Sequence, residues 1–177
     1  MIRYLAPIVF FAVMVPVFIF GLHRDPTVLP SPLIDRQAPA FRLPSLEHPG
    51  QIVSSDDYAG QLALVNVWAT WCSGCRQEHG FLLDLARRNE IPIIGLNWRD
   101  ERAAAMSWLD TLGDPYTATG FDGDGRVGID WGVYGAPETF LVGADGIVLH
   151  KHIAPLTEQV WQDEFLPIIN AARESRP

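Results

Sequence analysis

An alternation of strand-like and helix-like patterns in the middle of the chain constrains the fold more than any other feature of the sequence. Leu62–Trp68 and Ile91–Trp98 are nearly continuous apolar runs, which are typical of strands covered on both faces of a sheet. Residues 73–89 and 101–113 carry apolar side chains at helical spacing, and Gly113 ends the second of these segments. The order strand, helix, strand, helix favours parallel pairing of the two strands.

The C-terminal part of the chain predicts a different kind of pairing. Residues 138–152 have the pattern of two strands around an Asp145-Gly146 turn, which is a strong signal for an antiparallel hairpin. A last helix is expected over residues 157–172. The sequence therefore predicts an α/β domain whose central sheet is mixed, parallel first and antiparallel at one edge, and is flanked by helices.

The N-terminal part contains an apolar segment, Leu5–Leu22, that runs for 18 residues without a charge. As a helix it would span roughly 27 Å, close to the hydrocarbon thickness of a bilayer, and such helices tolerate Pro7 and Pro16. A cleaved signal peptide is the alternative, because it too begins with a basic residue such as Arg3. Its apolar core is only about 7–15 residues, however, and it ends in a small-x-small cleavage site, which is missing here. We therefore expect an uncleaved transmembrane anchor.

Four segments follow from these patterns: a short N-terminal segment (residues 1–4), the anchor (5–22), a proline-rich linker (23–37) and one folded domain (38–177). The prolines predict that the linker is extended and acts as a tether. Arginines lie on both sides of the anchor, so the positive-inside rule does not give its orientation.

Composition excludes some classes of function. Hydrophobic residues make up 48% of the 177 residues and charged residues 19%, which suits a packed globular core rather than a disordered chain. The formal net charge is -8, and no basic stripe is visible, so we expect no nucleic-acid partner.

The only two cysteines of the chain, Cys72 and Cys75, lie between the first predicted strand and the first predicted helix. A structural crosslink, half of a metal site and a reversible redox couple are the three interpretations. A crosslink over so short a loop would stabilise the fold by only about 2 kcal/mol, against about 4.7 kcal/mol for a loop of about 100 residues. A purely structural role is therefore the weakest explanation of the spacing.

A metal site is also disfavoured by the number of ligands. Structural zinc needs about four, whereas Cys72, Cys75 and His79 supply three at most. His150 and His152 alternate along a predicted strand and so share one face, but an exposed strand edge explains them better.

The redox interpretation fits the position of the pair. A cysteine at the start of a helix meets free N–H groups and the positive end of the helix dipole, which favour the nucleophilic thiolate. Cys75 lies one turn further into the helix, where we expect it to be more buried and to act as the resolving thiol. A Cys-x-x-Cys pair beside a β-α-β pattern is typical of thioredoxin-like proteins.

Two motifs make the assignment more specific. LVNVWATWCSGCRQEH together with GVYGAPETFLVGADG resembles the membrane-anchored thiol–disulfide interchange proteins of cytochrome c biogenesis, of the CcmG/DsbE type. The resemblance implies a thioredoxin-like domain in which Cys72 attacks and Cys75 resolves. It also implies that Ala136-Pro137 is a cis-proline dipeptide beside the disulfide, and that Glu78 and Glu138 are acidic residues near it.

Three further positions bear on the chemistry. Asn66 occupies the strand position where general thioredoxins carry a buried aspartate, so the resemblance implies that the acid–base role moves to Glu78 or Glu138. Trp71 directly precedes the pair and is expected to support it. Ser73-Gly74 stands where relatives usually have a proline-containing dipeptide, which puts the reduction potential in doubt.

The resemblance implies a function and a location. We expect a protein disulfide reductase that acts on apocytochrome c or on a haem-ligation protein and is re-reduced by a membrane electron-transfer protein. It would be a single-pass protein of the inner membrane with its catalytic domain on the periplasmic side. The redox-active disulfide would be its only redox centre, and no cofactor is expected. Residues 123–128 match the glycine pattern of dinucleotide-binding loops, but no long helix pattern follows them, so we expect no dinucleotide site there. A general periplasmic oxidoreductase with other clients and a metal or thiol chaperone are the alternatives.

Overall fold

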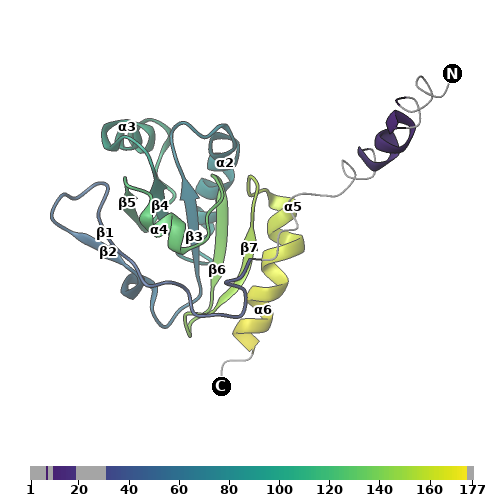
Figure 1. Cartoon of the computed structure of the whole chain (residues 1–177). Helices are drawn as coiled ribbons and strands as arrows, with labels where there is room; N and C mark the ends of the chain where they lie inside the picture. Colours follow the sequence, from purple (N-terminus) through teal and green to yellow (C-terminus); the bar gives the residue numbers. More distant parts are fainter. Residues whose placement is uncertain (1–6, 8–9, 19–30, 175–177) are drawn as a thin grey trace. The chain divides into compact units, whose positions relative to one another are not determined.

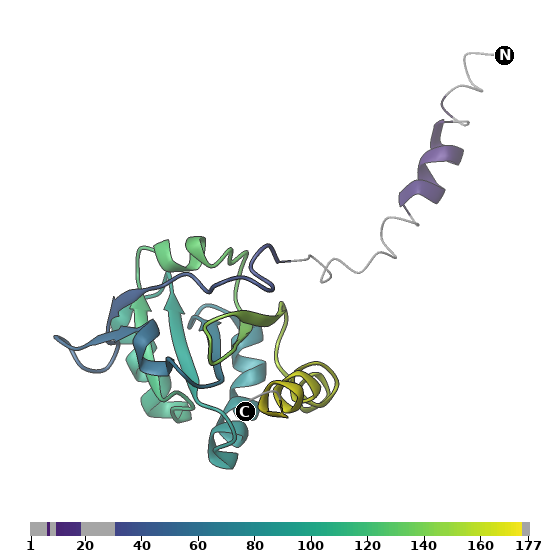
Figure 2. The same cartoon turned by 90° about the horizontal axis from the view of Figure 1, so that it is seen from below.

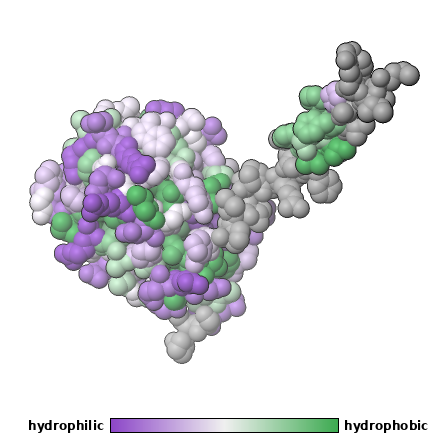
Figure 3. Space-filling view, viewed as in Figure 1, coloured by the Kyte–Doolittle hydropathy of each residue, from purple (hydrophilic) through white to green (hydrophobic). Residues whose placement is uncertain are grey.

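The computed structural model of the chain describes residue 7, residues 10–18 and residues 31–174. The chain divides into two compact units, Met1–Pro30 and Ser31–Pro177. In the first unit, residues 10–18 form a helix with mostly exposed, hydrophobic side chains (Figure 3). Within the described ranges, no helix combines the length and the apolarity needed to cross a bilayer. Of the predicted anchor, residues 5–6, 8–9 and 19–22 lie outside the described residues.

The second unit is built on a five-stranded sheet with the strand order β5-β4-β3-β6-β7 (Figure 1). Strand β3 pairs in parallel with β4, which pairs in parallel with β5; β3 pairs antiparallel with β6, which pairs antiparallel with β7. The predicted mixed sheet is therefore confirmed. The strands are β3 (Ala63–Trp68), β4 (Ile93–Trp98), β5 (Ala118–Asp122), β6 (Glu138–Val142) and β7 (Val148–His152).

Helices cover both faces of this sheet. Helix α2 ends where Asn89 adopts a left-handed conformation, with φ of 52°, and α3 ends at Gly113 as predicted. The C-terminal helix is continuous, and its middle turn, η2, is a π-helix that the sequence does not predict. The helices are α2 (Ser73–Arg88), α3 (Arg102–Leu112), α4 (Arg126–Asp130), α5 (Glu158–Val160), η2 (Trp161–Phe165) and α6 (Leu166–Glu174).

The strands alternate between two hydrophobic layers. Leu64 of β3 and Leu141 of β6 face one layer, which also contains side chains of α2 and of the C-terminal helix. Val65 and Phe140 face the opposite layer, where Trp131 at the end of α4 packs on the sheet. Figure 2 shows α4 on one side of the sheet and α2 and α3 on the other.

Short elements at the start of the domain are absent from the sequence-based prediction. A two-stranded hairpin, β1 (Arg42–Pro44) and β2 (Ile52–Ser54), is followed by a 3₁₀ turn, η1 (Ser55–Tyr58). A bridge between Ser45 and Gly120 places this hairpin beside the edge strand β5. The hairpin thereby covers part of an edge that would otherwise present unpaired backbone groups.

The folded domain begins earlier than the predicted boundary at Ala38. Its compact unit starts at Ser31. Ile34 and Gln37 form bridges with Val148 and Ile147, and the Asp35 N–H donates to the Val148 carbonyl oxygen at 2.9 Å. The last part of the predicted linker is therefore attached to β7 and is not a free tether.

Candidate active site

The two cysteines form a disulfide at the start of α2. Cys72 is the N-cap residue of the helix, and its Sγ accepts a hydrogen bond from the Cys75 N–H at 3.0 Å. The Cα atoms of the bonded pair are 5.3 Å apart. The sulfur of Cys72 therefore lies at the positive end of a 16-residue helix, where a thiolate is stabilised.

Burial does not distinguish the two cysteines. Cys72 is 5% exposed and Cys75 is 3% exposed, so the expected difference between them is not seen in this disulfide-bonded form. The first turn of α2 is covered closely: a Cβ atom added at Gly74 would lie 2.8 Å from Cδ of Pro137 and 3.3 Å from Cγ of Pro155. Any asymmetry between the thiols must come from their places in the helix rather than from their exposure.

The Ala136–Pro137 peptide bond is cis, as the resemblance implies. Ala136 packs against the hydrophobic cluster that contains Cys72 and Cys75, and the ring of Pro137 contacts Gly74 between them. The dipeptide therefore lies beside the disulfide.

The turn before Cys72 is fastened to the loop that follows β4. The backbone N–H and the hydroxyl of Thr70 each donate to the Asp100 carboxylate at 2.6 Å. The Trp71 indole N–H donates to the Arg99 carbonyl oxygen at 3.0 Å, and 56% of the Trp71 side chain remains exposed beside the disulfide. Sequence reasoning missed Thr70 and Asp100, although both directly follow predicted strands that pair in parallel.

Glu78 is buried beneath the disulfide. It lies one turn after Cys75 on the same face of α2, and only 1% of it is exposed. Its carboxylate accepts hydrogen bonds from Asn66 Nδ2 at 2.9 Å and from the Leu156 N–H at 2.8 Å. Burial raises the pKa of Glu78 from 4.5 to about 7, and the two hydrogen bonds oppose this rise. The carboxyl group can therefore exchange a proton near neutral pH.

Asn66 connects Glu78 to neighbouring strands and to the loop after α3. In the sheet it is paired with Thr139 of β6, and its Nδ2 donates to the Thr139 hydroxyl at 3.0 Å. Its Oδ1 accepts a hydrogen bond from the Tyr116 hydroxyl at 2.9 Å. Tyr116 is a site residue that sequence reasoning missed, because nothing local marks a tyrosine that reaches a strand 50 residues away.

Glu138 does not face the cysteines. Alternation along β6 puts it with Phe140 on the α4 side of the sheet, whereas Thr139 faces α2. The Glu138 carboxylate is fully buried, lies 2.9 Å from the Lys151 ammonium, and accepts a hydrogen bond from the Tyr134 N–H at 2.7 Å. Glu138 follows the cis-proline dipeptide in the chain, but strand alternation turns its side chain toward Lys151, which compensates its charge.

Comparison with known proteins identifies the family. Residues 34–164 match the Redoxin family model. The thiol:disulfide interchange protein DsbE of Allochromatium vinosum is 47% identical over 175 residues, which cover 99% of this chain and 97% of that protein. The DsbE protein of Escherichia coli strain K12 is 44% identical over 170 residues, which cover 93% of this chain and 91% of that protein. The chain belongs to the DsbE family.

A solved structure agrees with this assignment. The crystal structure of a proposed thiol:disulfide interchange protein DsbE from Chlorobium tepidum superposes with a TM-score of 0.65 at 26% identity, covering 77% of this chain and 94% of that one. This DsbE-family protein is thus a thiol–disulfide oxidoreductase with a thioredoxin-like fold, and its redox centre is a disulfide within the chain.

The histidines considered as metal ligands have other partners in this DsbE-family protein. His79 contacts the Gly113 carbonyl oxygen through Nε2 at 3.0 Å, and its Nδ1 accepts from the Trp108 indole at 3.3 Å. His150 and His152 each contact one oxygen of Glu164 at 3.0 Å. Their side chains are 25% and 13% exposed, so they do not form the exposed edge that was expected. Across the described ranges, no group of three or more metal-ligating side chains is placed to hold an ion.

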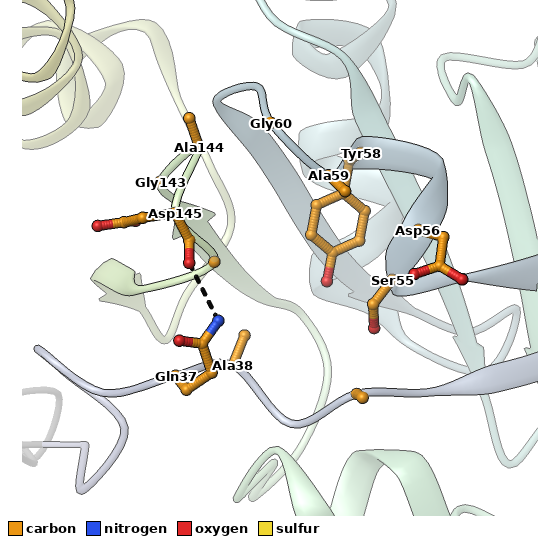
Figure 4. A pocket seen from close by; sticks show the side chains of 12 residues that line it. Gln37, Ala38, Ser55, Asp56, Tyr58, Ala59, Gly60, Gly143, Ala144 and Asp145 are labelled. Atoms are coloured by element: carbon orange, nitrogen blue, oxygen red, sulfur yellow. Dashed lines mark hydrogen bonds between the residues drawn. The ribbon is translucent and has the colours of Figure 1, made fainter. Parts of the chain in front are cut away.

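One hollow of the domain lies away from the disulfide. It has a volume of about 250 Å³ and is lined by residues 37–40 at the start of the domain, by η1 and the residues that follow it, and by the β6–β7 turn (Figure 4). Val142, at the end of β6, pairs with Ala63, at the start of β3, whereas Cys72 follows the opposite end of β3. This hollow is therefore separate from the redox centre. Its labelled lining residues are Gln37, Ala38, Ser55, Asp56, Tyr58, Ala59, Gly60, Gly143, Ala144 and Asp145.

Proposed function

We propose that this protein is a reductase that transfers electrons to disulfides of client proteins, with Cys72 as the attacking thiol and Cys75 as the resolving thiol. The observation that carries the proposal is the position of Cys72 at the N-cap of α2, where its Sγ accepts the Cys75 N–H. A thiolate there gains the helix dipole and a backbone hydrogen bond. Cys75, inside the first turn, has no comparable position.

The reaction then follows two exchanges. The Cys72 thiolate attacks one sulfur of the client disulfide, and the other client sulfur leaves and takes up a proton. Cys75 loses its proton and attacks the Cys72 sulfur of the mixed disulfide, which releases the second client thiol. Two electrons and two protons reach the client, and the Cys72–Cys75 disulfide is left for a membrane electron-transfer protein to reduce.

Glu78 is the proposed proton acceptor for Cys75. The two side chains are three residues apart on one helix face, a spacing that brings Cβ atoms to about 5–6 Å. Since the pKa of Glu78 is about 7, the carboxylate can take the thiol proton and return it at the pH of the periplasm. Asn66 cannot do so, because an amide does not titrate in this range.

The direction of electron flow is inferred from the same carboxylate. When Glu78 is ionised, its negative charge opposes a second negative charge on the nearby cysteines, which makes the reduced form less acidic and a better electron donor. Glu138 takes no part in this effect because Lys151 neutralises it on the other face of the sheet. Replacement of Glu78 by Gln is expected to raise the reduction potential of the pair.

The proposed client is apocytochrome c or a protein of haem ligation, and the proposed location is the periplasmic side of the inner membrane. Support comes from the sequence resemblance, from the DsbE relatives and from the apolar segment 5–22, which we propose as the anchor. Haem attachment needs free client thiols, and an oxidising compartment removes them. A reductant tethered to the membrane would restore them.

Trapping of clients tests this proposal. Cys75→Ser is expected to accumulate mixed disulfides through Cys72, because the first exchange starts but the second cannot finish. Cys72→Ser is expected to trap little. Identification of an apocytochrome c or a haem-ligation protein in the trapped complexes supports the specific reductase. A broad mixture of exported proteins favours a general oxidoreductase, and equal trapping by both variants refutes the assignment of the attacking thiol.

A further inference from the structure

The orientation of the Asn66 amide determines whether an N–H donor or a carbonyl oxygen faces the Glu78 carboxylate. In the observed orientation, both N–H groups of Asn66 are used, one by Glu78 Oε1 at 2.9 Å and one by the Thr139 hydroxyl at 3.0 Å. A hydrogen bond donated to a carboxylate favours its ionised form. If the amide turned over, its Oδ1 would face Glu78 and would instead favour the protonated carboxyl group.

Tyr116 is held where it can decide between these two orientations. Its ring stacks on Trp68, with centroids 5.5 Å apart and planes 15° apart. Below the ring lies Gly95 of β4, where an added Cβ would come within 3.0 Å of Tyr116 Cγ. The backbone N–H of Tyr116 donates to Asp114 at 2.8 Å. These three contacts hold the partly buried Tyr116 in place, and its hydroxyl meets Asn66 Oδ1 at 2.9 Å.

The hydroxyl of Tyr116 favours one orientation because its proton is donated to the Asn66 oxygen. Among the contacts of residues 31–174, the oxygen of Asn66 is the acceptor found for it. Turning the amide over would present N–H groups to this O–H and leave its proton without that acceptor, which is costly beside the fully buried Asn66. Thr139 does not discriminate in this way, since a freely rotating aliphatic hydroxyl donates or accepts.

We propose that Tyr116 is a positioning residue of the thiol–disulfide exchange, whose hydroxyl locks the Asn66 amide so that it donates to the Glu78 carboxylate. The inference rests on the proposed role of Glu78 as the proton acceptor for Cys75. It adds a second element to that role: the loop after α3 sets the protonation of a group on α2 through a strand residue between them.

Among residues 31–174, few titratable groups contact Glu78. Asn66 of β3, Thr139 of β6 and the Leu156 N–H before α5 are neutral, and Cys75 shares its helix face. The remaining group is Tyr116 itself, whose pKa is raised well above its usual value by burial and then by the charge of Glu78. The phenol therefore stays protonated, and remains a donor, throughout the range in which Glu78 titrates.

Infrared titration of the full-length, oxidised protein in detergent tests the proposal. The carbonyl band of the protonated Glu78 carboxyl group is assigned by its loss in Glu78→Gln, and its midpoint is followed with pH. Tyr116→Phe is expected to raise this midpoint by about one pH unit, the size expected for the loss of one hydrogen bond to a charged group. Tyr58→Phe, which removes a buried tyrosine hydroxyl on the opposite side of the sheet, is expected to leave this midpoint unchanged.

Kinetics provide a second measurement. Oxidised glutathione serves as the disulfide substrate. A rise of one unit in the pKa of Glu78 would lower its ionised fraction at pH 7 from about one half to about one tenth. The resolving step should therefore slow about fivefold at pH 7 and recover at alkaline pH. A general loss of structure would not recover in this way. Site-specific 3-fluorotyrosine at position 116 keeps the ring and strengthens the donor, so it should lower the midpoint even if Tyr116→Phe folds poorly.

The outcomes separate the two proposals. A midpoint in Tyr116→Phe equal to that of the wild type, with the band absent from Glu78→Gln, overturns the role of Tyr116 alone. A band and a pH profile that survive in Glu78→Gln refute the role of Glu78 itself. An unchanged midpoint of the Glu78 band with 3-fluorotyrosine at position 116 also contradicts the positioning role of Tyr116.

Discussion

Glu78 should make the stability of the oxidised domain fall as the pH rises. Its pKa is raised from 4.5 to about 7 in the folded state, so between these values the folded chain keeps a proton that the unfolded chain has lost. Stability decreases with pH wherever the folded state binds more protons. The contribution is present below pH 4.5, is lost as the pH rises through about 7, and amounts to about 3 kcal/mol at 1.36 kcal/mol per pKa unit.

Urea denaturation of the disulfide-bonded domain, beginning at Ser31, measures this effect. The disulfide removes the two thiols from the titration. We expect the free energy of unfolding of the wild type, relative to that of Glu78→Gln, to fall by about 2.5 kcal/mol between pH 5 and pH 8. His79 has the opposite effect, because burial lowers its pKa and stability from this group rises with pH, but it is present in both proteins and cancels in the difference.

Asp84→Asn is the matched control, since Asp84 lies on the same helix but is exposed. The free energy of unfolding of Asp84→Asn should change with pH in the same way as that of the wild type. A difference between wild type and Glu78→Gln that stays constant from pH 5 to pH 8 would show that Glu78 ionises as an ordinary surface carboxylate. Both the proton-acceptor assignment and the argument from burial would then be refuted.

Three further predictions concern the stability of the folded domain. Lys151→Met should lower the free energy of unfolding by about 3–5 kcal/mol in urea denaturation, because it leaves the buried Glu138 unpaired, and adding Glu138→Gln should restore most of the loss. Gly74→Ala should lower the free energy of unfolding by about 1–3 kcal/mol, because its Cβ would lie 2.8 Å from the ring of Pro137. Ser73→Pro should be tolerated, because position 73 is the first residue of α2. Thermal denaturation of the two variants tests this difference. Asp100→Ala removes the acceptor of two 2.6 Å hydrogen bonds from the turn before the disulfide and should lower the unfolding free energy by about 2 kcal/mol; equal stability to wild type would contradict this.

The central part of the fold could be predicted because its signals are local. Two buried strands, the helix that carries the cysteines and the hairpin at Asp145-Gly146 each have a pattern within one segment, and all four are present. Strand β5 was missed because Gly120 interrupts a run of only five residues. Its glycine is needed for packing: a Cβ there would lie 3.0 Å from Leu43 of the hairpin, a contact that only the tertiary structure creates.

The site was predictable to a smaller extent. The Cys-x-x-Cys pair and the proline dipeptide are sequence motifs, so Cys72, Cys75 and Pro137 could be named in advance. Tyr116 and Asp100 could not, because each acts on a residue at least 30 positions away in the chain and neither has a local pattern of its own. Long-range hydrogen bonds of this kind follow from the register of the sheet, which short motifs do not specify.

Glu78 and Glu138 belong to two different motifs, and the comparison shows why two acidic residues near one site need not share a role. Both precede or follow an active-site element by a few residues, and both are buried, Glu78 at 1% and Glu138 at 0% exposure. On α2, a spacing of three residues keeps Glu78 on the face of Cys75. On β6, side chains alternate between the two faces of the sheet, so Glu138 lies on the face where it contacts Lys151, and Thr139 lies on the opposite face beside Asn66. Of these two glutamates, Glu138 has a compensating lysine and Glu78 has none, and for this reason the proposal gives the acid–base role to Glu78.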